Sequence, residues 1–432
     1  MTTGLIIAAP HSDAGKTTLT LALLRALRDT LRPGAFKCGP DYIDPRFHEA
    51  ASGATCYNLD TWAMSDDSLG EIASHHADRR VSLVEGVMGL FDGAADGRGS
   101  TAELARRTGW PVVLVVDCKG LSDSVAPLVA GFRDFDPAVS IAGVLLNRVG
   151  SDSHEARLRQ ALAPLGVPVL GSLKRSDALQ LPRRHLGLLQ ADEIHTLDHY
   201  LDAAAHAVQQ TVDLERLIAC ARPCALRPDH THSPWVPDLG PRVAVANDIA
   251  FAFCYPHWRA RWARSGVTVL PFSPLNDEPP NTDATGVFLP GGYPELHADT
   301  LASATRFKSA LADQAARGTP VYGECGGFMV LGESLVDADG TAHSMCELLP
   351  IRTSFAEPRL HLGYRQLSGA LPTPFAADTL AAHEFHYSHL TGNAGAPTDV
   401  AIHDALGRAA SSTFHSRGSV MGSYVHLIDR PA

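Results

Sequence analysis

Short apolar runs alternate with helix-like segments along the first part of the chain. Six runs have the length and composition of buried strands, at 5–8, 35–38, 81–85, 112–117, 141–146 and 167–170. The segments between them carry apolar residues at helical spacing, as at 19–31, 101–108 and 122–132. Strands that alternate with helices form parallel sheets with crossover helices on both faces. The pattern predicts a doubly wound α/β domain.

A second α/β region begins after a proline-rich passage. A helix-like stretch at 197–220 leads into residues 222–238, where prolines interrupt helix and strand alike. Strands are then predicted at 243–246, 267–271, 286–289 and 321–322, followed by shorter strands and turns, including 381–390. We therefore expect a first domain at 1–195, a helix and linker at 196–240, and a second domain with a mixed sheet at 241–432.

Composition narrows the class of protein. A chain of 432 residues can form two or three domains, and its apolar content of 45% is ordinary for a globular protein. Acidic residues exceed basic ones, 47 against 36, which argues against nucleic-acid binding. No apolar run reaches the roughly 18–20 residues of a membrane span, and no signal-peptide pattern is visible. With eight scattered cysteines, the chain is expected to be cytoplasmic, with neither nucleic acid nor membrane as a partner.

The turn after the first strand carries a candidate nucleotide site. It resembles a phosphate loop, in which backbone N–H groups surround the phosphates, a lysine neutralises charge and a threonine can hold Mg²⁺. The match is partial because Pro10 replaces the first glycine. A helix start with an incidental lysine is the alternative, but the flanking strand and helix favour a nucleotide site. The candidate ATP-binding residues are Asp13, Ala14, Gly15, Lys16, Thr17 and Thr18.

Acidic residues at strand ends could complete a magnesium site. Glu85 ends an apolar strand, and Asp41 and Asp44 lie in a Gly/Pro turn after another. Mg²⁺ prefers oxygen ligands, so Thr17, Asp44 and Glu85 form a candidate set. Either acidic stretch alone could instead cap a turn. Asn147, at the end of a later strand, either contacts adenine or caps a helix.

A candidate nucleophile lies in the second domain. Cys325 is flanked by glycines between a predicted strand and helix, so it would sit on a sharp turn. A thiol at a helix N-terminus is expected to have a lowered pKa, and His426 would be its base. Backbone N–H groups at Gly292 and Gly326 would stabilise an oxyanion. A buried structural cysteine is the alternative.

One histidine-rich stretch has residue types that bind metals. His383, Glu384 and His386 lack the spacing of a zinc-protease helix, and on a strand the two histidines would face opposite sides. We therefore do not predict a metal site there.

Six motifs together resemble the cobyrinate or hydrogenobyrinate a,c-diamide synthases of corrinoid biosynthesis. They lie at 8–18, 36–45, 85–93, 289–295, 322–327 and 383–388, and the resemblance covers essentially the full length. It implies an N-terminal dethiobiotin synthetase-like P-loop domain and a C-terminal class I glutamine amidotransferase domain.

The resemblance also implies a reaction. Cys325 would attack glutamine with the help of His426, and the released ammonia would reach the first domain. There ATP and Mg²⁺ would convert substrate carboxylates into acyl phosphates, which ammonia would amidate on the a- and c-acetate groups. Asp41, Tyr42 and Asp44 would lie near the substrate, and Arg98 and Arg148 are candidates for binding it. The implied partners are glutamine and a corrinoid polycarboxylic acid, with a homodimer as a possible assembly.

Two positions depart from the family pattern. Asp13 replaces a usual glycine, and Ile428 stands where class I amidotransferases often place the acid that orients the histidine. Glu384 is a candidate for that orienting acid.

Three other functions compete with the diamide synthase. Cobyric acid synthase shares both domains but amidates other carboxylates. A nucleotide-dependent partitioning protein would leave the Cys325 turn unexplained, and a non-enzymatic ATP-binding module would lack glutaminase activity. The sequence does not decide between cobalt-free and cobalt-containing substrates, with a slight preference for hydrogenobyrinate.

Overall fold

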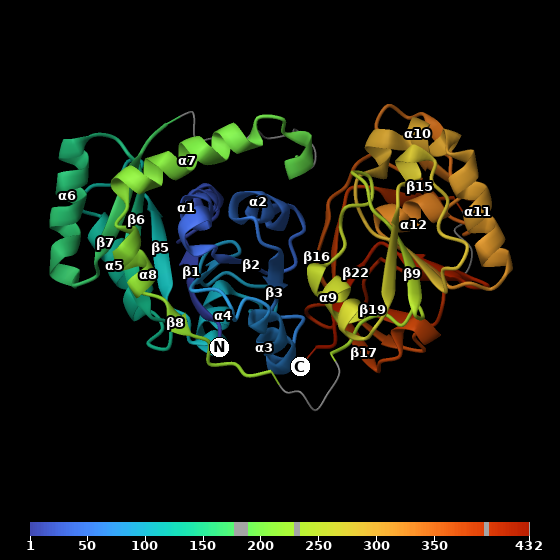
Figure 1. Cartoon of the computed structure of the whole chain (residues 1–432), viewed down its shortest axis with the longest axis horizontal. Helices are drawn as coiled ribbons and strands as arrows, with labels where there is room; N and C mark the ends of the chain where they lie inside the picture. Colours follow the sequence, from blue (N-terminus) through green and yellow to red (C-terminus); the bar gives the residue numbers. More distant parts are fainter. Residues whose placement is uncertain (177–188, 229–233, 393–396, 432) are drawn as a thin grey trace. The chain divides into compact units, whose positions relative to one another are not determined.

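The computed structural model of the chain describes residues 1–176, 189–228, 234–392 and 397–431 (Figure 1). Its contacts divide the chain into two compact units, Met1–His232 and Ser233–Ala432. Part of the predicted linker, residues 229–233, lies outside the described residues. Among the helices that are described, we find none with the length and apolar character to cross a membrane.

The first unit is built on a parallel sheet with the order β3-β2-β4-β1-β5-β6-β7. The strands are β1 (Thr3–Ala8), β2 (Gly34–Cys38), β3 (Cys56–Leu59), β4 (Ser82–Glu85), β5 (Val112–Asp117), β6 (Ile141–Val149) and β7 (Val169–Lys174). A short strand, β8 (Arg222–Pro223), pairs antiparallel with β1. The central strands are almost wholly buried, as expected for a sheet covered on both faces. The predicted doubly wound fold is confirmed.

Helices connect these strands. They are α1 (Lys16–Leu31), α2 (Ile43–Ser52), α3 (Asp66–Ser74), α4 (Thr101–Thr108), α5 (Val125–Asp134), α6 (Asp152–Leu162), α7 (Leu197–Thr211) and α8 (Leu214–Ala219), with 3₁₀ turns at Ala163–Leu165 and Ala191–Glu193. Side chains of Ser65, Ser100 and Ser151 cap α3, α4 and α6.

The helical stretch that the sequence analysis groups with the linker lies instead in the first unit. Helix α7 runs across α1 and α2 (Figure 1), and Arg25 of α1 pairs with Asp198 and Asp202 of α7 at 3.1 and 2.7 Å. The buried face of α7, which includes Leu201, Ala204 and Val208, explains this packing.

The second unit contains three sheets. A six-stranded sheet has the order β10-β9-β11-β12-β21-β20, and all its pairs are parallel except β20 with β21. Its strands are β9 (Arg242–Ala246), β10 (Thr268–Phe272), β11 (Gly286–Leu289), β12 (Val321–Glu324), β20 (Phe414–Arg417) and β21 (Val420–Ser423). The predicted mixed sheet is therefore present.

Two smaller sheets have four strands each. One combines β13 (Ser334–Val336), β14 (Ala342–Ser344), β15 (Arg352–Ser354) and β18 (His389–Thr391), and the other β16 (His361–Gly369), β17 (Thr379–His386), β19 (Val400–Asp404) and β22 (His426–Asp429). The stretch predicted at 381–390 is therefore divided between two sheets.

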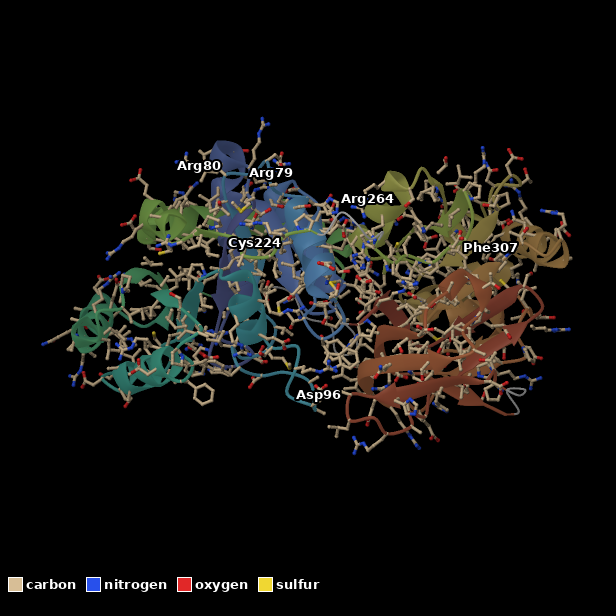
Figure 2. The ribbon with its side chains drawn as sticks, turned by 90° about the horizontal axis from the view of Figure 1, so that it is seen from below. Arg79, Arg80, Asp96, Cys224, Arg264 and Phe307 are labelled. Carbon is tan, nitrogen blue, oxygen red and sulfur yellow. The ribbon has the colours of Figure 1, made fainter. Side chains whose placement is uncertain are left out.

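Helices complete the core of the second unit. They are α9 (Pro256–Arg264), α10 (Ala298–Ser303), α11 (Thr305–Ala316) and α12 (Gly326–Leu331), with 3₁₀ turns at Pro274–Asn276, Pro294–His297 and Thr373–Phe375. Phe307 of α11, marked in Figure 2, is fully buried, and its ring centroid lies 6.1 Å from that of Phe272 on β10.

Candidate functional site

The phosphate-loop candidate lies between β1 and α1 and is held by β6. Gly15 has a φ of 94°, and a Cβ there would lie 2.1 Å from the Asn147 amide nitrogen. That nitrogen donates to the Ala14 carbonyl at 2.9 Å. Asn147 therefore supports the loop, and the cap of the following helix is Ser151. Asp13 is exposed with a φ of 62°, a backbone conformation that favours glycine, which accounts for the glycine usual at this position.

The first residues of α1 bring a cation and a hydroxyl to the end of β4. The Lys16 ammonium donates to the Met88 carbonyl at 2.5 Å, and burial lowers its pKa. The Thr17 hydroxyl donates to Glu85 Oε1 at 2.6 Å. The Thr18 side chain forms a hydrogen bond with Tyr200 of α7; burial raises the pKa of that tyrosine, and this bond opposes the shift.

Lys37, which the sequence analysis did not identify as a site residue, pairs with two of the predicted metal ligands. It stands opposite Glu85 on the neighbouring strand, and its ammonium lies 2.6 Å from Asp44 Oδ2 and 3.1 Å from Glu85 Oε1. Asp41 Oδ2 lies 4.0 Å away. Burial opposes the charge on Lys37, but the three carboxylates outweigh it and raise the pKa. The only signal in the sequence was a lysine inside an otherwise apolar strand.

Glu85 has a third hydrogen-bond partner, besides Thr17 and Lys37, which the sequence analysis also did not identify. His48 of α2, fully buried, lies with Nε2 2.6 Å from Glu85 Oε2. Burial would raise the pKa of Glu85, but Lys37 and the hydrogen bonds from His48 and Thr17 lower it. Glu85 is therefore an ionised oxygen donor beside the phosphate loop. The Thr17 hydroxyl thus contacts Glu85, and the Lys37 ammonium bridges Glu85 and Asp44, so all three predicted ligands lie close by and offer oxygen atoms, which suit Mg²⁺.

The turn that carries Asp41 is braced by its neighbours. Asp41 Oδ1 accepts from the Ile43 amide at 2.8 Å, and the Asn58 amide donates to the carbonyls of Gly39 and Asp41 at 2.9 and 2.7 Å. Burial and the adjacent Asp44 raise the pKa of Asp41 to about 8. Tyr42, at the start of α2, is half-buried.

Both arginines considered for substrate binding are already paired. Arg98 Nε lies 2.8 Å from Asp96 Oδ2, and its guanidinium stands 5.2 Å from the Trp62 ring centroid. Asp96, marked in Figure 2, also accepts from Trp62 Nε1 at 3.0 Å. Arg148 pairs with Asp117 at 2.6 Å.

The second candidate centre is a strained turn between β12 and α12. Cys325 has a φ of 46° and a ψ of −104°, and it is 3% exposed. Strained backbone of this kind is concentrated at functional sites. A Cβ on Gly327 would lie 1.9 Å from the Leu289 carbonyl oxygen, so the turn packs directly on β11. A Cβ on Gly326 would lie 3.0 Å from the Gly292 amide nitrogen, so the two predicted oxyanion residues are adjacent.

The prediction of a lowered pKa for the Cys325 thiol is wrong for this structure. Burial, together with the carboxylate of Glu295, raises the pKa above its usual value. The thiol lies 3.9 Å from the Phe385 carbonyl. A thiol so enclosed must give its proton to a neighbouring base when it reacts.

His426 is a buried imidazole close to a carboxylate. It is 2% exposed, and burial, with contributions from His383 and His386, lowers its pKa to about 3. Its Nδ1 lies 3.8 Å from Glu324 Oε2. A Cβ on Gly291 would lie 2.3 Å from the His426 Cε1, so only glycine fits beside the ring. Neutral imidazole is the form that accepts a proton.

Neither of the two positions considered for an acid that orients His426 supplies one. The Ile428 carbonyl accepts from His257 and Trp258, both at 3.0 Å. Glu384 pairs with Arg365 at 2.6 Å and with His386 at 2.8 Å. His361, Glu384 and His386 place one potential ligand atom each within 4.8 Å of one another, but the Glu384 carboxylate already binds Arg365.

Both units match known families. Residues 5–189 match the CobQ/CobB/MinD/ParA nucleotide binding domain family, and residues 242–431 match the CobB/CobQ-like glutamine amidotransferase domain family.

Three similar proteins carry the name hydrogenobyrinate a,c-diamide synthase. The protein from Brucella abortus biovar 1 is 51% identical, over 99% of this chain and 98% of its own. The protein from Rhizobium meliloti is 49% identical over 99% of both chains, and that from Rhodobacter capsulatus is 51% identical over 98% of both. With this identity over nearly the whole length, the chain belongs to the hydrogenobyrinate a,c-diamide synthase family.

Proposed function

We propose that this chain is an ATP- and glutamine-dependent ligase that amidates the a- and c-acetate carboxylates of hydrogenobyrinic acid. The observation that carries the proposal is the pair of separate centres in one polypeptide. One combines a buried thiol, a neutral imidazole and paired backbone amides, and the other a phosphate loop with clustered carboxylates. The name of the relatives supports hydrogenobyrinic acid over its cobalt-containing counterpart.

In the second unit, His426 takes the proton of the Cys325 thiol as the sulfur attacks the amide carbon of glutamine. The N–H groups of Gly292 and Gly326 stabilise the charge that develops on the carbonyl oxygen. The C–N bond then breaks, and His426 returns the proton to the leaving ammonia. Water hydrolyses the remaining thioester to glutamate and restores the thiol.

In the first unit, Lys16 and the backbone amides of residues 13–18 bind the phosphates of ATP. Thr17, Asp44 and Glu85 would hold Mg²⁺, which when bound neutralises phosphate charge. A substrate carboxylate oxygen attacks the γ-phosphorus, and ADP leaves. Ammonia attacks the resulting acyl phosphate, and phosphate leaves with formation of the amide.

Lys37 pairs through its ammonium with two of the residues proposed to bind Mg²⁺. Its ammonium now occupies the oxygens of Asp44 and Glu85 that would hold the ion. A cation bound there would compete with Lys37 for both carboxylates, because the ion and the ammonium both direct positive charge toward the same oxygens. The displaced ammonium would then be available to a phosphate or to the substrate carboxylate.

The decisive experiment is incubation of the purified chain with ATP, Mg²⁺ and glutamine and with either hydrogenobyrinic or cobyrinic acid. Mass spectrometry should show two amides added to hydrogenobyrinic acid, with phosphate and glutamate formed in step. Amidation of the a,c-diamide at other carboxylates would favour the cobyric acid synthase alternative. A homodimer in the cytoplasm stays a prediction from the sequence, and light scattering tests the dimer.

A further inference from the structure

Glu324 and His426 meet although 102 positions separate them in the chain. Glu324 ends β12, directly before Cys325, and His426 begins β22. Pairing of β12 with β21 sets Glu324 opposite Ser423, three positions before His426. Both side chains are nearly inaccessible, with 1% and 2% of their surface exposed. The contact is therefore fixed by the sheet and not by a surface loop.

The Glu324 carboxylate is held so that one oxygen faces the imidazole. Its Oε1 accepts from the Tyr322 hydroxyl at 2.8 Å and from the Leu427 amide at 2.9 Å. Its Oε2 lies 3.8 Å from His426 Nδ1. The bond to Leu427 anchors the carboxylate to the residue next to His426. This separation exceeds a hydrogen bond, and such contacts often shorten when substrate binds.

A carboxylate at Nδ1 has a definite chemical effect. It favours the tautomer with a proton on Nδ1, which leaves Nε2 free to take the thiol proton. It also stabilises the imidazolium formed in that transfer. The position two residues after His426 cannot do this because it is Ile428, and Glu384 is engaged by Arg365 and His386.

We infer that Glu324 is the positioning residue of the glutamine-hydrolysing centre and orients His426 through Nδ1. The inference rests on the proposed function, and it assigns the third group of the centre to the residue that directly precedes the nucleophile.

The ionisation of Glu324 should make its effect on His426 measurable in a pH profile. Burial raises the pKa of Glu324 to about 8, although hydrogen bonds from Leu427 and Tyr322 oppose the shift. Other titratable groups nearby are Cys325 and Tyr322 on the side of β12, and His383, Glu384 and His386 on β17. Only ionised Glu324 can accept from Nδ1–H, so glutamine hydrolysis should rise as pH increases through this range.

The test compares Glu324→Gln with Glu384→Gln in the full chain. Glutamine hydrolysis, ammonia-dependent synthesis and the pH profile of hydrolysis are measured for each. Glu324→Gln should lower kcat for glutamine by at least about 100-fold, because a comparable loss of an orienting carboxylate costs up to ~10⁴-fold. Ammonia-dependent synthesis should be retained, and the rise near pH 8 should disappear. Glu384→Gln should retain that rise.

Two further variants test the inference if Glu324→Gln does not fold. Glu324→Asp keeps the charge and should recover part of the lost rate. Tyr322→Phe keeps the ring against Phe288 and Phe375 but removes one hydrogen bond that stabilises the ionised Glu324 carboxylate, so it should raise the pH at which activity rises. The Tyr322 hydroxyl bonds to Glu324 and touches no reacting atom.

The outcomes separate the inference from the function beneath it. Wild-type rates and an unchanged pH profile in Glu324→Gln overturn the inference alone. The same holds if Glu384→Gln removes the rise and Glu324→Gln does not. If the wild-type chain hydrolyses no glutamine at all, the proposed function fails.

Discussion

Lys37 and Glu85 stand directly opposite each other on β2 and β4, with the ammonium 3.1 Å from the carboxylate oxygen Oε1. Both side chains are buried, with 5% and 1% of their surface exposed. The pair therefore ties the turn that carries Asp44 to the end of the strand beside the phosphate loop.

Lys37→Met should destabilise the first unit strongly. The change leaves Glu85 and Asp44 without their shared cation, and removing one partner of a buried pair costs about 3–5 kcal/mol. Denaturant unfolding of the full chain measures the loss. Lys174→Met is the control. It removes an exposed ion pair in which Lys174 lies 2.6 Å from Asp152, the same distance that separates Lys37 from Asp44, and it should change stability little. Equal effects of the two changes would contradict a structural role for the buried pair.

Lys16→Ala should abolish synthesis with glutamine and with ammonia alike. The change removes the cation expected to neutralise nucleotide phosphates, while the thiol centre belongs to the other unit. Nucleotide binding by calorimetry and amide formation by mass spectrometry are the measurements. Synthesis at the wild-type rate by this variant would remove Lys16 from the nucleotide site.

Cys325→Ala should abolish the use of glutamine and spare ammonia-dependent synthesis. Alanine has no nucleophile, but ammonia supplied in solution bypasses the missing step. The comparison of glutamine and ammonium chloride as nitrogen sources in one assay gives the result. If glutamine still drives amidation, the assigned roles are wrong.

Gly291→Ala should slow glutamine hydrolysis with little effect on the synthetase reaction. The added Cβ would lie 2.3 Å from His426 Cε1, so the ring must move from its place beside Glu324. A misplacement of about 1 Å can cost ~100-fold in rate. Gly131→Ala, on α5 with open space around the added atom, is the control and should leave hydrolysis unchanged.

The fold could be read from the apolar pattern because the central strands are continuous buried runs. Strand β3 was missed because its four residues, Cys56–Leu59, include Tyr57 and Asn58 and form no apolar run. The helix α7 was predicted, but its packing on α1 depends on a long-range contact that spacing does not encode.

The chemistry of single residues was harder to predict than their presence in a motif. The pKa of Cys325 depends on burial, which is a property of the folded unit and reverses the effect expected of a helix N-terminus. Glu324 lies inside a recognised motif, but its closeness to His426 depends on the pairing of β12 with β21, which the motif does not reveal. Lys37 and His48 were overlooked because single polar residues among apolar ones carry no spacing signal.

The three bonds to Glu85 come from α1, β2 and α2, through Thr17, Lys37 and His48. A metal ion bound to this carboxylate would therefore disturb the turn at residues 39–45 as well, through Lys37 and Asp44. If the substrate binds at this turn, as the sequence predicts, a ligand at either site alters the affinity at the other, and linkage requires the effect to be mutual. Nucleotide and corrinoid should therefore change each other's affinity by the same factor, which calorimetry of each ligand with and without the other measures.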